Sequence, residues 1–225
     1  EEDWHIATGR HRPVPTPAPA PSVEGLPQER LPDEGVPQEG LPDEGVPIQI
    51  LADGPAFYED AFAKLVRVAL KMAQERIVLV TPYFVPDQSL QAALVATAHA
   101  GVRVELLLPA ASNHASADWA RRPFLRELVE EGVAVLFYEP GMVHAKAAVV
   151  DQSFGWISSA NMDMRSITLN FEIAAVFYDS ACARQLLQWY EGLAADARPV
   201  ARQELDSGRG RRLIEGVLQL LSPLI

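Results

Sequence analysis

From residue 48 onward, short apolar runs alternate with amphipathic segments, and this alternation restricts the chain to an α/β fold. Ile77–Val80 is a continuous apolar run, as in a strand that is buried on both faces. Residues 57–75 carry apolar side chains at helical spacing. Helices between successive strands form crossovers, so we expect a mixed β-sheet sandwiched between helical layers. The other expected elements are strands at 48–51, 102–108 and 133–138, and helices from Asp87 to Gly101, at 117–131 and at 180–195.

Residues 1–47 hold most of the prolines, many of them in a five-residue repeat of the form Gly25-Leu26-Pro27-Gln28-Glu29. A proline at every fifth position forbids a helix or a central strand, and the repeat offers no aromatic side chain to a core. This composition predicts an extended, acidic, semi-rigid linker. A proline-rich ligand for a partner domain is the alternative.

Charge and hydropathy narrow the function classes. Residues 1–47 carry ten acidic and three basic side chains, so −7 of the net charge of −11 belongs to them and −4 to the remainder. Nucleic-acid surfaces are usually basic, so no nucleic-acid partner is expected and a nuclease is disfavoured. No apolar run reaches the length of about 18 residues that spans a membrane. Residues 209–225 are basic at first and then mainly apolar, which predicts a C-terminal helix. This helix would either dock on its own domain or lie on a membrane surface.

Three segments in the second half of the chain each present two polar side chains at positions i and i+2. We expect all three to be strands, at 143–151, 155–161 and 170–177, on which such residues share a face about 7 Å apart. Buried polar groups without partners are costly, so these groups should meet one another or a polar ligand. A sheet with one solvated face is the alternative. The paired residues are His144 and Lys146, Ser159 and Asn161, and Asn170 and Glu172.

The order and spacing of these residues resemble the catalytic signature of the phospholipase D superfamily. The signature is His144-x-Lys146-x4-Asp151, followed by Ser159-x-Asn161, Arg165-Ser166 and Asn170-x-Glu172. Residues 81–87, 161–166 and 169–172 are similar to the second catalytic half of bacterial cardiolipin synthases. The similarity extends over residues 48–225, which would form a phospholipase D-like catalytic domain. Residues 1–9 resemble the end of the first catalytic half.

The resemblance implies phosphatidyl transfer: two phosphatidylglycerols would give cardiolipin and glycerol through a phosphohistidine, with no cofactor and no metal. The first half usually supplies the nucleophile in this family, so His144 is expected to be the general acid/base. Lys146, Ser159 and Asn161 would hold the phosphate oxygens. The other histidines share no regular spacing with carboxylates or thiols, so the sequence likewise predicts no metal site.

The remaining signature residues have supporting roles in this interpretation. Glu172 should accept a hydrogen bond from the His144 ring and fix its tautomer, with Asn170 and Arg165 nearby. The signature places Asp151 with the catalytic residues. Its strand parity is opposite to that of His144, however, which points to a structural role such as an ion pair.

The chain begins with Glu1, and we expect it to be the linker and second half of a longer enzyme. The preceding half, or a second copy, would supply the other His-Lys motif. The expected location is the bacterial cytoplasmic membrane, with anchoring by segments absent from this chain. The site would act on phosphatidylglycerol at the membrane surface.

Two other functions remain open at this point. A phospholipase D-type hydrolase would use the same residues with water as acceptor, and a non-catalytic pairing half would not turn over at all. Aromatic residues give two further expectations. Tyr83 and Phe84 could contact acyl chains, whereas Trp156 and Trp189 are expected in the core.

Overall fold

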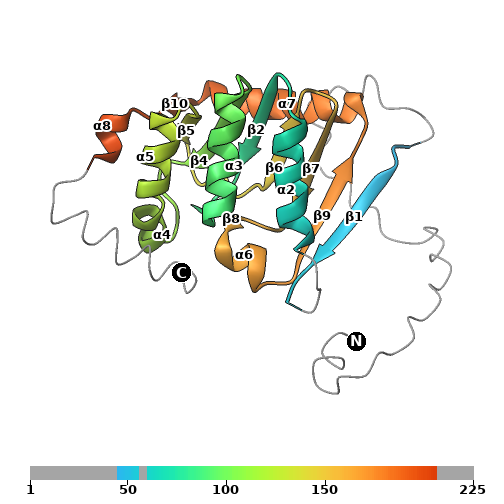
Figure 1. Ribbon diagram of the computed structural model, residues 1–225. Coiled ribbons are helices and arrows are strands. Elements are labelled where there is room, and N and C mark those ends of the chain that lie inside the picture. Colours follow the sequence, from blue (N-terminus) through green and yellow to red (C-terminus); the bar gives the residue numbers. More distant parts are fainter. Residues whose placement is uncertain (1–44, 56–59, 207–225) are drawn as a thin grey trace, which may run out of the picture. The chain divides into compact units, whose positions relative to one another are not determined.

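The computed structural model describes residues 45–55 and 60–206 (Figure 1). Most of the expected linker, residues 1–9 and the expected helix at 209–225 lie outside the described residues. In the described part, eight strands form one mixed sheet in the order β1-β9-β7-β6-β2-β4-β5-β10, and β3 pairs with β8. The strands are β1 Ile48–Asp53, β2 Arg76–Val80, β3 Phe84–Val85, β4 Arg103–Pro109, β5 Ala134–Tyr138, β6 Ala147–Val150, β7 Phe154–Ser158, β8 Met162–Asp163, β9 Glu172–Phe177 and β10 Ala197–Pro199.

The direction of the strands follows from the connections. Helical crossovers join β2, β4 and β5, which are parallel, as the alternating pattern predicted. Short connections follow after β5, so β6 is antiparallel to β2 and β7 is antiparallel to β6. The helices are α2 Ala61–Met72, α3 Gln88–His99, α4 Ala115–Ala120, α5 Arg122–Glu130, α6 Met164–Thr168, α7 Ser180–Ala195 and α8 Arg202–Leu205.

Two of the expected helices show how local sequence sets helix ends. The Asp87 carboxylate accepts a hydrogen bond from Leu90 N at 2.6 Å, which confirms it as the cap of α3. The single helix expected at 117–131 is wrong, because the structure has α4 and α5 there. Pro123 lies in the first turn of α5, where its missing N–H is tolerated, although it could not continue a helix from α4.

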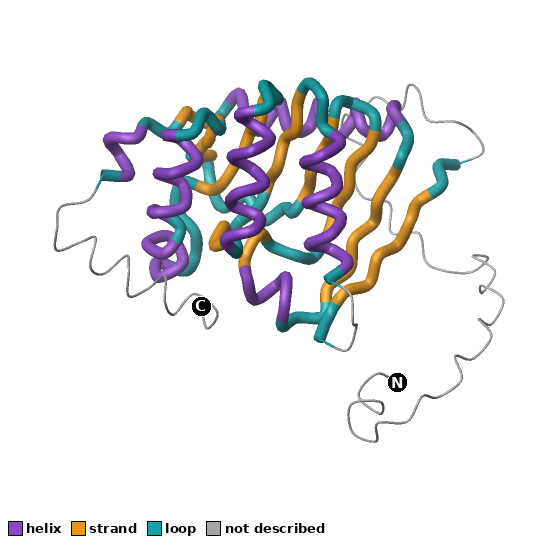
Figure 2. Tube along the Cα trace, in the orientation of Figure 1, coloured by secondary structure: helices purple, strands orange, loops and turns teal. Residues whose placement is uncertain are grey.

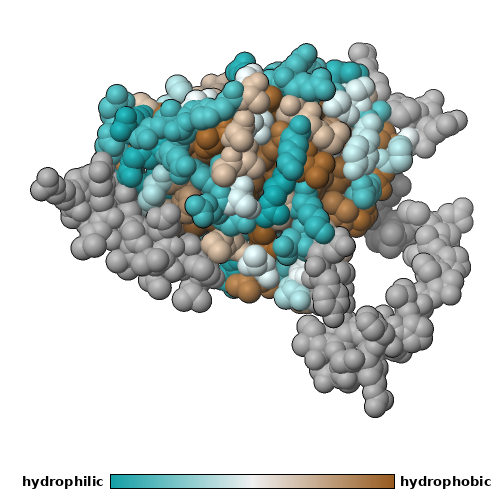
Figure 3. Space-filling view, in the orientation of Figure 1, coloured by the Kyte–Doolittle hydropathy of each residue, from teal (hydrophilic) through white to brown (hydrophobic). Residues whose placement is uncertain are grey.

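Helices cover both faces of the sheet, as predicted for this class. Helices α2, α3 and α5 lie side by side over one face, and α7 crosses the other (Figures 1 and 2). Figure 3 shows the side of α2, α3 and α5, where hydrophilic residues cover much of the helical layer. Separate apolar clusters lie on the two faces, with Leu79 and Leu106 on the α2 side and Val78 and Leu107 on the α7 side.

The three polar segments are shorter as strands than expected. His144 and Lys146 precede β6, Ser159 and Asn161 follow β7, and Asn170 precedes β9. Trp156 is fully buried and confirmed as a core residue, whereas Trp189 is 40% exposed and the prediction for it was wrong. Phe84 is fully buried in the core, so it is not available to an acyl chain.

Candidate active site

The polar residues predicted from the sequence gather at one end of the sheet, with one exception. Ala147 at the start of β6 pairs with Val80 at the carboxyl end of β2, so His144 and Lys146 lie where the parallel strands end. Ser158 at the end of β7 pairs with Ala174 near the start of β9. Antiparallel neighbours thus bring the beginning of one strand to the end of the next. This is the edge at which ligands bind in open α/β sheets.

His144 and Lys146 form the centre of this group. Lys146 Nζ lies 3.0 Å from His144 Nδ1 and 3.3 Å from Nε2, and it also donates to the His144 carbonyl oxygen at 3.0 Å. Burial, together with the charge of Lys146, lowers the pKa of His144 below its ordinary value. The imidazole is therefore neutral at pH 7, which is the form that can attack phosphorus or accept a proton.

The charge state of Lys146 reflects two opposing influences. Burial lowers its pKa below the ordinary value, while the carboxylates of Glu172 and Asp163 act in the opposite direction. The two carboxylates thus favour the charged ammonium form of Lys146. The site thus combines a neutral imidazole with a fixed positive charge, which suits an anionic phosphodiester.

Glu172 makes different contacts from those predicted. Its carboxylate accepts a hydrogen bond from Ser159 Oγ through one oxygen and from Asn170 Nδ2, at 3.2 Å, through the other. The expected hydrogen bond between Glu172 and the His144 ring is not among the contacts of the described residues. The reason is that both ring nitrogens of His144 face Lys146 instead. Glu172 therefore orients Ser159 and acts on Lys146 through its charge.

A small parallel pair of strands brings Asn161 next to Tyr83. Phe84 and Val85 of β3 pair with Met162 and Asp163 of β8. Thr81 is fully buried, and its hydroxyl donates to the Tyr83 carbonyl oxygen at 2.9 Å and accepts from Met162 N at 3.2 Å. The Tyr83 and His144 rings are nearly perpendicular, at an interplanar angle of 83°, with ring centroids 6.3 Å apart. Asn161 and Tyr83, which are 78 positions apart in sequence, are thereby fixed around the same site.

Asp151 is the exception, because the structure places it at the other end of β6, away from His144. Its carboxylate accepts hydrogen bonds from the backbone N–H groups of Gln74, Glu75 and Arg76 at 2.8, 2.9 and 2.8 Å. The expected structural role fits this position, but it is fulfilled by capping backbone groups rather than by an ion pair. The grouping of Asp151 with the catalytic residues is not supported by its position.

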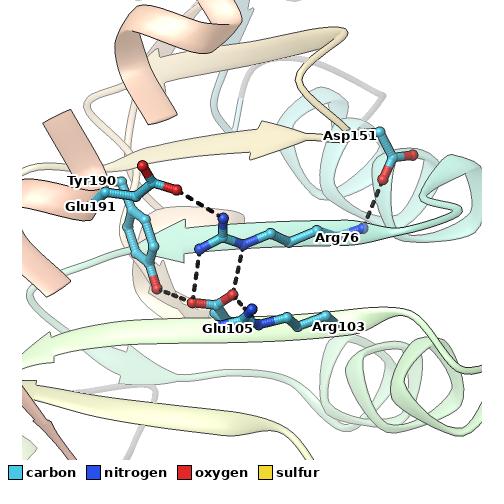
Figure 4. Close-up of polar contacts among 6 residues, drawn as sticks. All are labelled: Arg76, Arg103, Glu105, Asp151, Tyr190 and Glu191. Carbon is cyan, nitrogen blue, oxygen red and sulfur yellow. Dashed lines mark hydrogen bonds and ion pairs between the residues drawn. The ribbon is translucent and has the colours of Figure 1, made fainter. Parts of the chain in front are cut away.

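Arg76, whose backbone N–H donates to Asp151, also belongs to a charge network around the buried Glu105 (Figure 4). Glu105 is 2% exposed, and Arg76 Nε donates to it at 2.6 Å while Tyr190 Oη donates to it at 2.7 Å. Burial alone would raise the pKa of Glu105, but hydrogen bonds from Arg76 and Tyr190 bring it below its ordinary value. Arg76 also reaches Glu191 of α7 at 3.1 Å. The network therefore fixes α7 to β2 and β4.

Helix α7 also forms one wall of a cavity that opens on the His144–Lys146 pair. The cavity has a volume of about 640 Å³, and its apolar wall consists of Ile157, Leu186 and Trp189. Ile157 is 53% exposed and Trp189 is 40% exposed, so large apolar side chains are partly exposed to solvent beside the charged pair. This apolar wall was missed from the sequence. The helical spacing of α7 showed that an apolar stripe existed but not where it would lie relative to His144.

Comparison with known proteins gives the family. Residues 66–194, more than half of the chain, match the family described as "Cardiolipin synthase, PLD-like domain". The chain belongs to this family. The chain is 33% identical to cardiolipin synthase A of Erwinia tasmaniensis over 224 residues, an alignment that covers 99% of this chain and 43% of that protein. It is 32% identical over its full length to cardiolipin synthase 2 of Bacillus cereus, of which it covers 40%.

Solved structures confirm the fold of the phospholipase D-like domain. Phosphatidylserine synthase of Haemophilus influenzae matches with a TM-score of 0.67 at 16% identity, covering 79% of this chain and 48% of that one. The phospholipase D family member Nuc of Salmonella typhimurium matches with a TM-score of 0.59 at 21% identity, covering 68% of this chain and 97% of that one. The chain spans about two-fifths of the length of the curated relatives cited above. None of the helices in the described residues has the length and apolar character needed to cross a membrane.

Proposed function

We propose that this domain contributes one half of the active site of a phosphatidyltransferase that converts two phosphatidylglycerols to cardiolipin and glycerol. The observation that carries the proposal is the His144–Lys146 pair at the mouth of an apolar cavity of about 640 Å³. A phosphodiester needs the cation and the imidazole, and the acyl part of a lipid needs an apolar wall. The names of the cardiolipin synthase relatives agree with this assignment.

In the proposed reaction, a histidine nitrogen attacks phosphorus and the bond from phosphorus to the leaving glycerol oxygen breaks. A second histidine donates the proton that the glycerol oxygen takes up. That histidine then removes a proton from the hydroxyl of an acceptor phosphatidylglycerol, whose oxygen displaces the phosphohistidine nitrogen. One phosphodiester is broken and one is formed, so the exchange needs no external energy source.

His144 is assigned as the general acid/base, with the nucleophile supplied by the other half. Its lowered pKa makes it neutral in the unliganded site. A bound phosphodiester adds negative charge beside the ring, which favours protonation before the leaving-group step. Lys146 would bind phosphate oxygens, and Asn161 would add an amide hydrogen. The Ser159 hydroxyl donates to Glu172 in the unliganded site, so it would join them by turning its one hydrogen from Glu172 to the phosphate.

The second histidine would come from a preceding half or from a second copy of the domain. The sheet offers a surface for either on the α7 side, where Ile50, Ile157 and Ile173 are each more than half exposed. The strand register places them on one face, since Ile50 and Ile157 both pair with Ala175, two positions from Ile173. Such a face next to His144 suits the partner domain. The complete enzyme would work at the bacterial cytoplasmic membrane.

The test is cardiolipin formation from phosphatidylglycerol vesicles, followed by mass spectrometry at increasing protein concentrations. If two copies complete the site, the rate rises with the square of concentration while dimer is scarce. His144→Asn should reduce the rate by about 10²-fold or more. His99→Asn is the matched control, because His99 lies on α3 and pairs with Glu131 at 2.8 Å on the surface.

The products separate the alternatives. Phosphatidic acid instead of cardiolipin would show a hydrolase that uses water as acceptor. Binding of lipid headgroup without turnover at any concentration would exclude a site completed by a second copy. Absence of turnover in the full-length parent enzyme as well would show a non-catalytic pairing half. Equal rates for His144→Asn and the unmodified protein would refute the assigned site.

A further inference from the structure

A second cavity, of about 190 Å³, is lined in part by Tyr83, whose ring neighbours that of His144. Its lining includes the side chains of residues that the proposed chemistry does not explain. Tyr83 connects the two, because its ring lies 6.3 Å from the His144 ring and 5.6 Å from the His114 ring. The polar and charged side chains around this cavity include those of Tyr83, Asn161, Asp163, Arg165 and Asn170.

Asn161 leaves a hydrogen-bond acceptor unsatisfied in this cavity. Its amide nitrogen donates to Ser166 Oγ at 3.2 Å. Its amide oxygen is buried and has no hydrogen-bond partner among the described residues. A buried acceptor without a donor is costly, so a ligand that brings an N–H or O–H group would be favoured here. Phosphate oxygens at neutral pH are acceptors and cannot satisfy it.

Other groups around the cavity also accept hydrogen bonds. The Tyr83 hydroxyl donates to Asn113 Oδ1, which leaves the lone pairs of the phenol oxygen for a donor. The Asp163 carboxylate accepts from Ser166 N at 2.7 Å through one oxygen. Burial raises the pKa of Asp163, which reduces its preference for a cation.

Arg165 and Asn170 supply donors to the same cavity, so both kinds of partner are present. The positive charge of Arg165 opposes an ammonium group, and a hydroxyl group can meet donors and acceptors alike. A neutral ligand with several hydroxyl groups therefore matches the wall better than a phosphate or an amine. A cavity of about 190 Å³ has room for a three-carbon polyol.

We infer that this cavity is the subsite for the glycerol headgroup of phosphatidylglycerol, so that His144 has a polyol subsite and an acyl-chain wall beside it. The inference rests on the proposed function and adds how the enzyme selects an alcohol of this type. Asn161 would make two contacts with the substrate. One amide hydrogen would meet the phosphodiester, and the amide oxygen would accept from a glycerol hydroxyl.

The experiment compares two soluble probes without acyl chains, methyl phosphoglycerol and methyl phosphoethanolamine, of which only the first carries a glycerol, by titration calorimetry with the 225-residue protein. Both carry the same phosphodiester, so contacts to phosphate cancel in the ratio of their Kd values. We expect the glycerol probe to bind more tightly by about two- to tenfold for each hydrogen bond that only it makes.

Variants then locate the preference. Asn161→Ala should weaken both probes and bring the ratio close to one, and Tyr83→Phe should lower the ratio by about two- to tenfold without changing the ring. His144→Asn should weaken both probes with little change in the ratio. His99→Asn, on the surface of α3, should leave both affinities unchanged.

Each outcome decides between the two ideas. Equal affinities in the unmodified protein, or a preference for the ethanolamine probe, would overturn the polyol subsite while the proposed function stands. A glycerol preference that survives both Asn161→Ala and Tyr83→Phe would also overturn it. Binding of neither probe at millimolar concentration would refute the phosphodiester site itself and the inference with it.

Discussion

Replacement of Asp151 by alanine would test directly what this signature residue does. The change removes hydrogen bonds from Gln74 N, Glu75 N and Arg76 N, at 2.8, 2.9 and 2.8 Å. Bonds of this kind contribute about 1 kcal/mol each when solvent can reach them, so we expect a loss of about 3 kcal/mol in the free energy of unfolding. For a protein of this size the Tm should fall by about 6 to 12 °C.

Two further variants calibrate this number. Asp151 has φ 47°, in the left-handed region that asparagine tolerates well. Asp151→Asn keeps that tolerance and one amide oxygen, so it should lose about half as much stability. Asp196→Ala is the control, because Asp196 is exposed at the end of α7 and its side chain has no hydrogen bond in the described residues. Its effect should stay within about 0.5 kcal/mol.

Urea unfolding followed by circular dichroism measures these differences, and headgroup titration supplies the second measurement. Below its Tm, folded Asp151→Ala should bind methyl phosphoglycerol with the affinity of the unmodified protein, because His144 lies at the other end of β6. A free energy of unfolding for Asp151→Ala within about 1 kcal/mol of that of the unmodified protein would contradict the capping role of Asp151. Loss of headgroup binding by the folded variant would contradict its separation from the site.

Two other predictions concern the site and the sheet. Lys146→Met should raise the pKa of His144, because the variant lacks the neighbouring positive charge that lowers it. NMR titration of the ring measures this pKa, and the protonated fraction at a given acidic pH should increase. An unchanged or lower pKa would contradict the pairing of His144 with Lys146. Gly155→Ala should destabilise the domain by about 1 to 3 kcal/mol, since its Cβ would lie 2.5 Å from Ala148 O and 3.0 Å from the Phe177 ring. Gly192→Ala on α7 meets nothing within 4 Å and should stabilise by about 0.5 to 1 kcal/mol in the same unfolding assay; equal effects of the two changes would refute the packing argument.

The fold could be predicted from local pattern because its strands are short and their connections are regular. The continuous apolar run at Ile77–Val80 indicated a central strand, and β2 has β6 on one side and β4 on the other. Helix ends were predictable where a side chain sets them, as at Asp87. The break between α4 and α5 was missed, although Pro123 is visible in the sequence, because the apolar pattern continues through it.

The site was predictable in its members and less so in its contacts. Sequence spacing identified His144, Lys146, Asn161 and Glu172 as members of one group, because buried polar residues that share a strand face need partners. Which partner each one takes depends on side-chain directions at the ends of strands, where alternation no longer applies. Glu172 therefore contacts Ser159 and Asn170 rather than His144.

The cavities depend on contacts between residues distant in sequence, and such contacts leave no local pattern. Leu186 and Trp189 lie beside the His144–Lys146 pair because α7 crosses the sheet at that point. His114 lies beside Tyr83 because β2 and β4 are parallel neighbours, so the segments that follow them leave the sheet at the same edge. Periodicity could assign each of these residues to an element but not to a wall of the site.

The spacing of the signature itself follows from the geometry of one strand. Lys146 and Asp151 flank β6, Ala147–Val150, and five steps along a strand cover about 17 Å. Asp151 therefore cannot contact a phosphate held by Lys146, whatever its side-chain rotamer. It instead binds the start of β2, the strand whose other end lies beside His144. The four residues between Lys146 and Asp151 therefore form the whole of β6. They connect the end of the sheet that carries His144 and Lys146 to the opposite end, where Asp151 fixes the register of β2 and β6.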